Sequence, residues 1–103
     1  MPTFVLAYHG GRRFKTREEG AAHKINWNAW VEDLGEMAIE PSRFFGQSSI
    51  VGAEGVTEGG GTNPISGITV LQAETLEAVL EKAKVCPHVQ IGGTIEVAEA
   101  MQM

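Results

Sequence analysis

The sequence lacks the features that would support disulfide or membrane chemistry. A single cysteine, Cys86, among 103 residues excludes an internal disulfide and is typical of proteins from a reducing compartment. No apolar run is long enough to cross a bilayer, and no basic residue precedes the short apolar stretch at the N-terminus, as one would in a signal peptide. These absences predict a soluble, cytoplasmic protein that does not act at membranes.

Basic residues are also scarce, with 8 Lys and Arg against 13 Asp and Glu and a net charge of −5, which argues against nucleic-acid binding. Four of these 8 nevertheless lie close together, at Arg12, Arg13, Lys15 and Arg17. They precede a predicted helix, whose N-terminus favours anions. The cluster therefore indicates either a contact for an acidic or phosphorylated small ligand, with Arg12 as the candidate, or a solvated loop.

The first half of the chain predicts a strand followed by a helix. Residues 3–9 are apolar on both alternating faces, which favours a strand covered on both sides. The Thr16-x-x-Glu19 pattern is typical of a capped helix start, so we expect a helix from about residue 17, ended at the latest by Pro41. Its apolar residues recur at spacings of three and four and predict one buried stripe: Trp27, Trp30, Val31, Leu34 and Met37 or Ala38.

The second half predicts two strands, a helix and a last strand. The strands are expected at 47–53 and 67–72 and the final strand at 94–98. The glycine-rich segment 57–64 is expected to be a loop, with a short hairpin extension as the alternative. The helix is expected from residue 74 or 75 to the Val85-Cys86-Pro87 segment, with its buried side chains at Leu76, Val79, Leu80 and Ala83. The order βαββαβ in one domain, 1–103, predicts a ferredoxin-like α+β fold with a four-stranded antiparallel sheet.

Two helices cover only one face of such a sheet. Because the predicted strands at 3–9 and 67–72 are apolar on both faces, the second face would expose an apolar patch unless another chain lay on it. We therefore expect a homodimer packed sheet to sheet, a dimeric α+β barrel. A small-molecule pocket is expected where the sheet, the first helix and the loops meet.

Several segments resemble the YCII-related proteins, whose members with a different central loop are called DGPF-domain proteins. The segments span nearly the whole chain: Phe4 to His9 with Gly10-Gly11, Trp27-x-x-Trp30 with Leu34-Gly35, Phe45-Gly46-Gln47-Ser48, Gly59-Gly60-Gly61-x-Asn63-Pro64-x-Ser66-Gly67, Ala83-Lys84-x-Cys86-Pro87-His88, and Gly92-Gly93-Thr94-Ile95-Glu96-Val97. The resemblance implies a cytoplasmic, bacterial-type dimeric α+β barrel. It implies little chemistry, because the family's function is mostly unestablished.

For that family, enzyme activity is proposed from a histidine and an aspartate near a pocket in the dimer cleft. Alignment on the apolar stripe puts Trp27 in the place of that histidine, and a shift of about one helical turn recruits His23 instead. The Asp-Gly-Pro-Phe motif is absent, and its region is here the glycine-rich loop. Related barrels include muconolactone isomerases and small monooxygenases, a likeness of fold only.

The histidines are the candidate catalytic residues. His9 ends the first strand, where side chains commonly line a pocket, although it would equally suit a surface position bonded to a loop. His23 shares a helical face with Trp27 and Trp30, and that stripe is either core or the aromatic wall of a pocket.

His88 lies two positions after Cys86 in a segment expected to be extended. The pair suggests either a working site or only the joint between helix and strand, in which Cys86 packs as a small hydrophobe and His88 bonds the loop. Two ligands are too few for a structural zinc site, and the glycine-rich loop lacks the Gly-Lys-Ser/Thr ending of a phosphate-binding loop, so neither metal nor cofactor is predicted.

The functional hypothesis is therefore a homodimer that binds a small polar or aromatic metabolite. His9, His23 and His88 are the candidate general acids or bases, and Trp27, Trp30 and Arg12 the candidate ligand contacts. The alternative is a non-catalytic dimerising or regulatory module whose aromatic stripe and Cys-Pro-His joint are purely structural.

Overall fold

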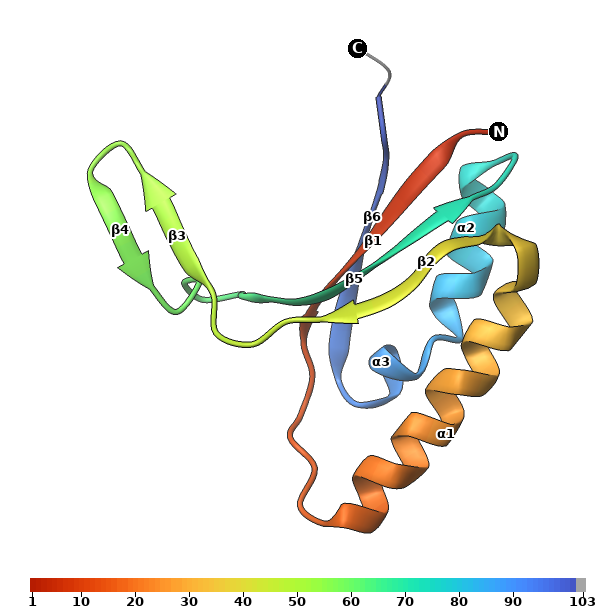
Figure 1. The fold of residues 1–103 in the computed structure, drawn as a ribbon, viewed down its shortest axis with the longest axis horizontal. Helices are drawn as coiled ribbons and strands as arrows, with labels where there is room; N and C mark the ends of the chain where they lie inside the picture. The colour runs from red at the N-terminus through yellow and green to blue at the C-terminus, as the bar shows by residue number, and fades with distance from the viewer. Residues whose placement is uncertain (102–103) are drawn as a thin grey trace.

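The computed structural model describes residues 1–101 and confirms the predicted α+β class (Figure 1). The elements in chain order are β1 (Thr3–Gly10), α1 (Arg17–Leu34), the 3-10 turn η1 (Gly35–Met37), β2 (Ala38–Phe44), β3 (Ser49–Gly52), β4 (Gly55–Glu58), β5 (Ile65–Gln72), α2 (Leu76–Lys84), α3 (Pro87–Gln90) and β6 (Gly93–Glu99). The main sheet has the order β2-β5-β1-β6, and all neighbouring strands are antiparallel. This is the ferredoxin-like arrangement.

Helix α1 begins where the capping pattern predicts. The hydroxyl oxygen of Thr16 accepts the backbone N–H of Glu19 at 3.1 Å, and the Glu19 carboxylate accepts the N–H of Lys15 at 3.0 Å. The helix ends at Gly35, whose φ of +55° is accessible to glycine at little cost. Within residues 1–101, no helix is both long enough and apolar enough to cross a membrane.

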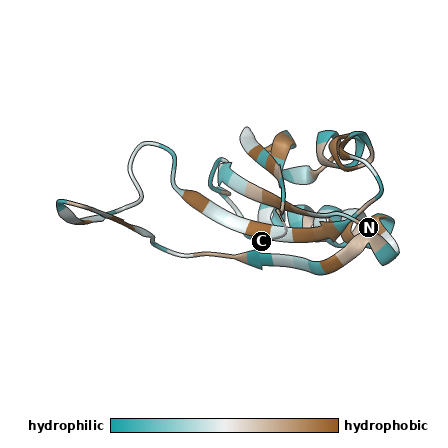
Figure 2. Ribbon diagram, turned by 90° about the horizontal axis from the view of Figure 1, so that it is seen from above, coloured by the Kyte–Doolittle hydropathy of each residue, from teal (hydrophilic) through white to brown (hydrophobic). Residues whose placement is uncertain are grey.

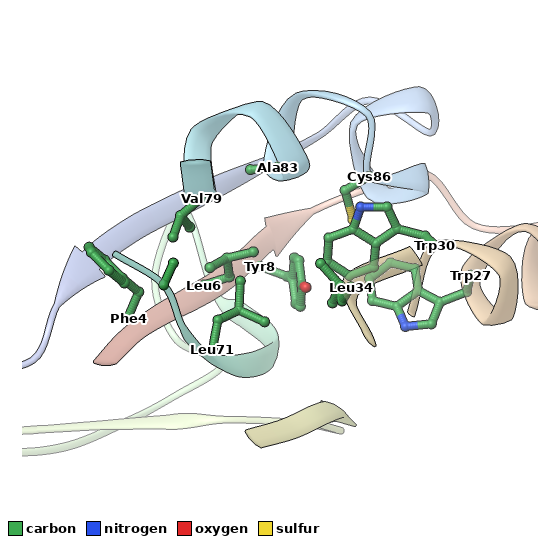
Figure 3. Packing of buried hydrophobic residues seen from close by; sticks show 11 residues of the cluster. Phe4, Leu6, Tyr8, Trp27, Trp30, Leu34, Leu71, Val79, Ala83 and Cys86 are labelled. Atoms are coloured by element: carbon green, nitrogen blue, oxygen red, sulfur yellow. The ribbon is translucent and has the colours of Figure 1, made fainter. Parts of the chain in front are cut away.

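The core lies between one face of the sheet and the helices. Phe4, Leu6 and Tyr8 of β1 are at most 1 % exposed and pack against side chains of α1 and α2 (Figure 3). The predicted α1 stripe is confirmed at Trp27, Trp30 and Leu34. Helix α2 buries only Val79 and Ala83, so the prediction that Leu76 and Leu80 are buried is wrong. The buried stripe of this nine-residue helix is narrower than the predicted one, and both leucines lie at its exposed side.

The second strand of the sheet is β2, so its predicted position at 47–53 is wrong. Pro41 lies inside β2, where it is tolerated because β2 is an edge strand and its register shifts between Glu40 and Arg43, the stretch that contains the proline. Its carbonyl still accepts a hydrogen bond from the Thr69 hydroxyl at 2.8 Å. The apolar residues near 50 form β3, which pairs only with β4 in a hairpin that extends away from the sheet (Figures 1 and 2).

The opposite face of the sheet carries a second apolar surface. Val5 pairs with Val70 and Ala7 with Ile68, and all four side chains are only partly buried because the helices lie on the other face. Such a surface, formed by cross-strand apolar pairs, is the kind that a second chain covers. The homodimer stays a prediction.

Candidate functional site

A cavity of about 320 Å³ opens on the helix side of the sheet, beside the end of β1. Aromatic rings, glycines and two histidines dominate its lining, which consists of Tyr8, Gly10, Gly11, Arg12, Phe14, His23, Trp27, Phe44, Ser66, His88 and Ile91. A larger depression, of about 730 Å³, lies between the two ends of the described chain, at 1–3 and 99–101, and has neither a histidine nor an aromatic residue in its lining. The smaller cavity is therefore the candidate site.

His88 is held tightly at the base of the cavity. Pro87 begins α3, so the predicted extended geometry of this segment is wrong, and His88 is 6 % exposed. Its Nε2 lies 2.9 Å from the carbonyl oxygen of His9. Because a carbonyl only accepts, Nε2 carries the proton, and Nδ1 is the acceptor of the neutral ring.

Two glycines make room for this ring. A Cβ on Gly93 would overlap the imidazole, and a Cβ on Gly11 would lie 3.1 Å from its Cε1 and 3.6 Å from its Nδ1. The ring of Tyr8 meets it edge-on, with 5.2 Å between centroids. His88 therefore has one ring position and one tautomer.

His23 lies on α1 between two aromatic rings, 5.0 Å from Phe14 and 5.7 Å from Trp27 between centroids. It is half-buried, unlike His88. Desolvation lowers the pKa of His23 below 6.5, and electrostatic interactions with His88 and with the Arg12 guanidinium lower it further. The ring is thus neutral at pH 7 and is able to accept a proton.

Trp27 forms a fixed wall of the cavity. Its indole N–H donates to the hydroxyl of Ser42 at 2.7 Å, and its ring packs 5.2 Å from Tyr8 and 5.1 Å from Phe44 between centroids. The Tyr8 hydroxyl lies 2.7 Å from that of Thr69. Burial raises the pKa of Tyr8, so its hydroxyl stays protonated. Tyr8 therefore contributes an aromatic wall to the cavity and no acid-base group.

The structure does not bring His9 and Trp30 to the cavity. His9 follows Val5 and Ala7 on the face away from the helices, with Nδ1 3.1 Å from the carbonyl of Asn63 and Nε2 3.3 Å from the carboxylate of Glu96. Trp30 is buried in the core, where its N–H donates to the carbonyl of Lys82 at 2.9 Å. His23, His88, Trp27 and Arg12 are the predicted site residues that line one cavity.

Cys86 is buried between α2 and α3 and does not line the cavity. Burial raises the pKa of its thiol from 9.0 to about 11, which removes the thiolate on which nucleophilic chemistry depends. This supports the structural interpretation of the cysteine. Among residues 1–101, no three His, Cys, Asp or Glu side chains gather closely enough to hold a metal ion.

The sequence did not identify most of the cavity's walls. Tyr8 could have been found from alternation, since it shares the face of Phe4 and Leu6, which the helices cover. Phe44 was missed together with strand β2. Phe14 and Ile91 lie in connecting segments, where periodicity gives no signal.

Comparison with known proteins shows a likeness of fold. No protein-family model matches the chain, and no curated protein matches it. A similar solved structure is that of 5-chloro-2-hydroxyhydroquinone dehydrochlorinase from Burkholderia phenoliruptrix AC1100, in complex with 2,5-dihydroxybenzoquinone. The TM-score is 0.59, with 98 % of this chain and 95 % of that chain covered at 12 % identity. The chain has the fold of the dimeric α+β barrel proteins. At this identity the likeness concerns the fold alone.

Proposed function

We propose that this chain is a cytoplasmic, YCII-related protein that acts as a homodimer and binds a small one-ring metabolite in the cavity between His23 and His88. One observation carries the proposal: two histidines from separate helices line one aromatic-walled cavity. Its volume of about 320 Å³ is at the lower end of the range of about 300–1,000 Å³ typical of ligand sites. A single substituted ring suits that space.

The similar dehydrochlorinase supports the choice of ligand size. That protein was solved in complex with 2,5-dihydroxybenzoquinone, a one-ring compound. In this chain, Phe14 and Trp27 offer aromatic surfaces against which such a ring packs favourably.

The chemistry proposed is histidine-assisted proton transfer in the isomerisation or breakdown of the bound molecule. His23 is neutral at pH 7 and half-exposed, so it is suited to take a proton from a substrate and to return it. His88, fixed by the His9 carbonyl, offers Nδ1 as a second acceptor near Gly11. Neither role requires a cofactor.

The proposal is tested by NMR, with a set of one-ring compounds titrated into the protein while the imidazole signals of His23 and the indole N–H of Trp27 are followed. We expect His23→Ala to weaken binding, because one wall of the cavity is lost. His9→Gln is the matched control and should leave binding unchanged, because that imidazole lies on the opposite face of the sheet. If His23→Ala left binding unchanged and His9→Gln weakened it, the assignment of the ligand to this cavity would be contradicted.

A further inference from the structure

The charge around the cavity is one-sided. Arg12 is the only Lys, Arg, Asp or Glu among the lining residues. None of the ion pairs formed within residues 1–101 involves it; the acidic partners in those pairs are Glu96, Glu40, Asp33 and Glu81. The cavity therefore has a guanidinium at its edge with no carboxylate of the protein paired to it, in a chain whose net charge is −5.

The position of this arginine is set by its backbone. The N–H of Arg12 donates to the carbonyl of Ile91 at 2.8 Å, which ties the segment after β1 to the segment after α3. Both residues line the cavity, so the guanidinium is attached to a fixed part of its rim. Less reorganisation is then needed when a ligand binds.

The acidic group of the adjoining groove is already engaged. Glu19 lines an adjoining groove of about 300 Å³ that also includes Arg12, Phe14 and His23. Its carboxylate, however, accepts the backbone N–H of Lys15 at the start of α1, at 3.0 Å. The Arg12 guanidinium is among the causes that lower the pKa of His23, which agrees with a positive potential at this edge of the cavity.

We infer that the cavity binds an organic anion, a single planar ring that carries an acidic oxygen group, with Arg12 binding the charged group and Phe14 and Trp27 packing on the ring. The inference rests on the proposed function and specifies its ligand class. A guanidinium presents two parallel N–H groups to a carboxylate, a geometry stronger and more specific than a neutral hydrogen bond. The surrounding aromatic lining accepts the ring.

A matched pair of probes tests the charge separately from the ring. Sodium benzoate and benzamide have nearly the same shape and differ in charge. Each is titrated into the wild-type protein, Arg12→Gln and Arg13→Gln, with the Trp27 indole N–H and the His23 ring followed by NMR. Arg13 neighbours Arg12 but does not line the cavity, so it controls for the loss of one positive charge.

We expect the wild-type protein and Arg13→Gln to bind benzoate at least about tenfold more tightly than benzamide, and Arg12→Gln to lose that preference. Equal binding of the two probes by the wild-type protein would overturn the inference and leave the cavity assignment intact. The inference would also be overturned if Arg12→Gln kept the preference for benzoate over benzamide, or if Arg13→Gln lost it. Signals of Trp27 and His23 that respond to neither probe would contradict the proposed function itself.

Discussion

The Nε2 atom of His88 donates to the carbonyl oxygen of His9 at 2.9 Å, across 79 positions of sequence. The bond joins α3 to the end of β1 and fixes the tautomer of the buried ring. It also separates the roles of two histidines that look alike in the sequence: His9 supports the cavity through its backbone, whereas its imidazole points to the other face of the sheet. The cavity depends on this junction.

Replacing Gly11 by alanine should disturb the junction. Gly11 has a φ of +94°, and a Cβ there would lie 3.1 Å from both Cε1 of His88 and Cδ1 of Ile91. We expect the free energy of unfolding in urea to fall by about 1–3 kcal/mol, the usual cost of a strained backbone position. Gly46→Ala is the control, because no atom lies within 4 Å of its Cβ position, and it should change stability by less than about 0.5 kcal/mol. Equal losses at both sites would show that Gly11 is not under steric constraint.

Alanine at His88 should cost far more stability than alanine at His23. Removing the buried His88 ring leaves a void between Gly11 and Gly93 and deprives the His9 carbonyl of its side-chain donor. The expected loss is about 2–4 kcal/mol, against less than about 1 kcal/mol for half-exposed His23. Urea unfolding of the two variants measures the difference. A loss of stability at His23 as large as that at His88 would contradict the assignment of His23 as a half-exposed residue and of His88 as a buried, structurally fixed one.

Sequence periodicity gave the fold but misplaced one strand. The helices and the strands β1, β5 and β6 were found because their apolar spacings report burial directly. Strand β2 was missed because Pro41 lies inside it, and proline is unfavourable in most strands. The strand was predicted at 47–53 instead because Ile50 and Val51 are more apolar, although both lie in an exposed hairpin.

The candidate site was predictable only in part. His23 and Trp27 share a helix face, and spacing alone brings them together. Whether His9 or His88 lies in the same cavity depends on contacts between segments that are distant in the sequence. Because α3 packs against β6, His88 is the histidine that lines the cavity. For His9 the signal was present: alternation puts it with Val5 and Ala7, on the face opposite to Tyr8.

Cys86 should resist alkylation in the folded protein. Burial raises the pKa of its thiol from 9.0 to about 11, so at pH 8 the thiolate fraction is about a hundredfold below that of an unperturbed thiol. Iodoacetamide labelling at pH 8, followed by mass spectrometry, should be slow in buffer and fast in urea. Because the pKa is raised on folding, the stability that the neutral thiol contributes is full below pH 9 and is lost as the pH rises through about 11. Similar labelling rates in buffer and urea would contradict its buried position.

The pKa of His23 should respond to charge at the cavity edge. It lies below 6.5 in the folded protein, so the stability linked to the neutral ring is present above pH 6.5 and is lost as the pH falls through the lower folded-state value. We expect Arg12→Gln to raise the pKa of His23, because one of the charges that lower it is removed. Titration of the imidazole Cε1–H by NMR measures this, and Arg13→Gln is the matched control. A midpoint that Arg12→Gln leaves unmoved would show that the guanidinium does not act on this ring.

The uncovered sheet face should form the homodimer. Val70 lies in its middle, paired with Val5, and the cross-strand pair of Ala7 and Ile68 adjoins it. An aspartate at position 70 would place a carboxylate in an apolar interface, at a cost of several kcal/mol. The dissociation constant of the dimer should therefore rise by more than about a hundredfold. Sedimentation velocity at low micromolar concentration should therefore give a dimer for the wild-type protein and a monomer for Val70→Asp.

Val85→Asp is the control for this last experiment, because Val85 is 59 % exposed at the end of α2, on the helix side of the molecule. The same charge added there should leave the dimer intact. A wild-type monomer would contradict the proposed homodimer. A dimer that survives Val70→Asp and dissociates with Val85→Asp would place the interface on the helices instead, and the apolar pairs of β1 and β5 would then face solvent without a partner.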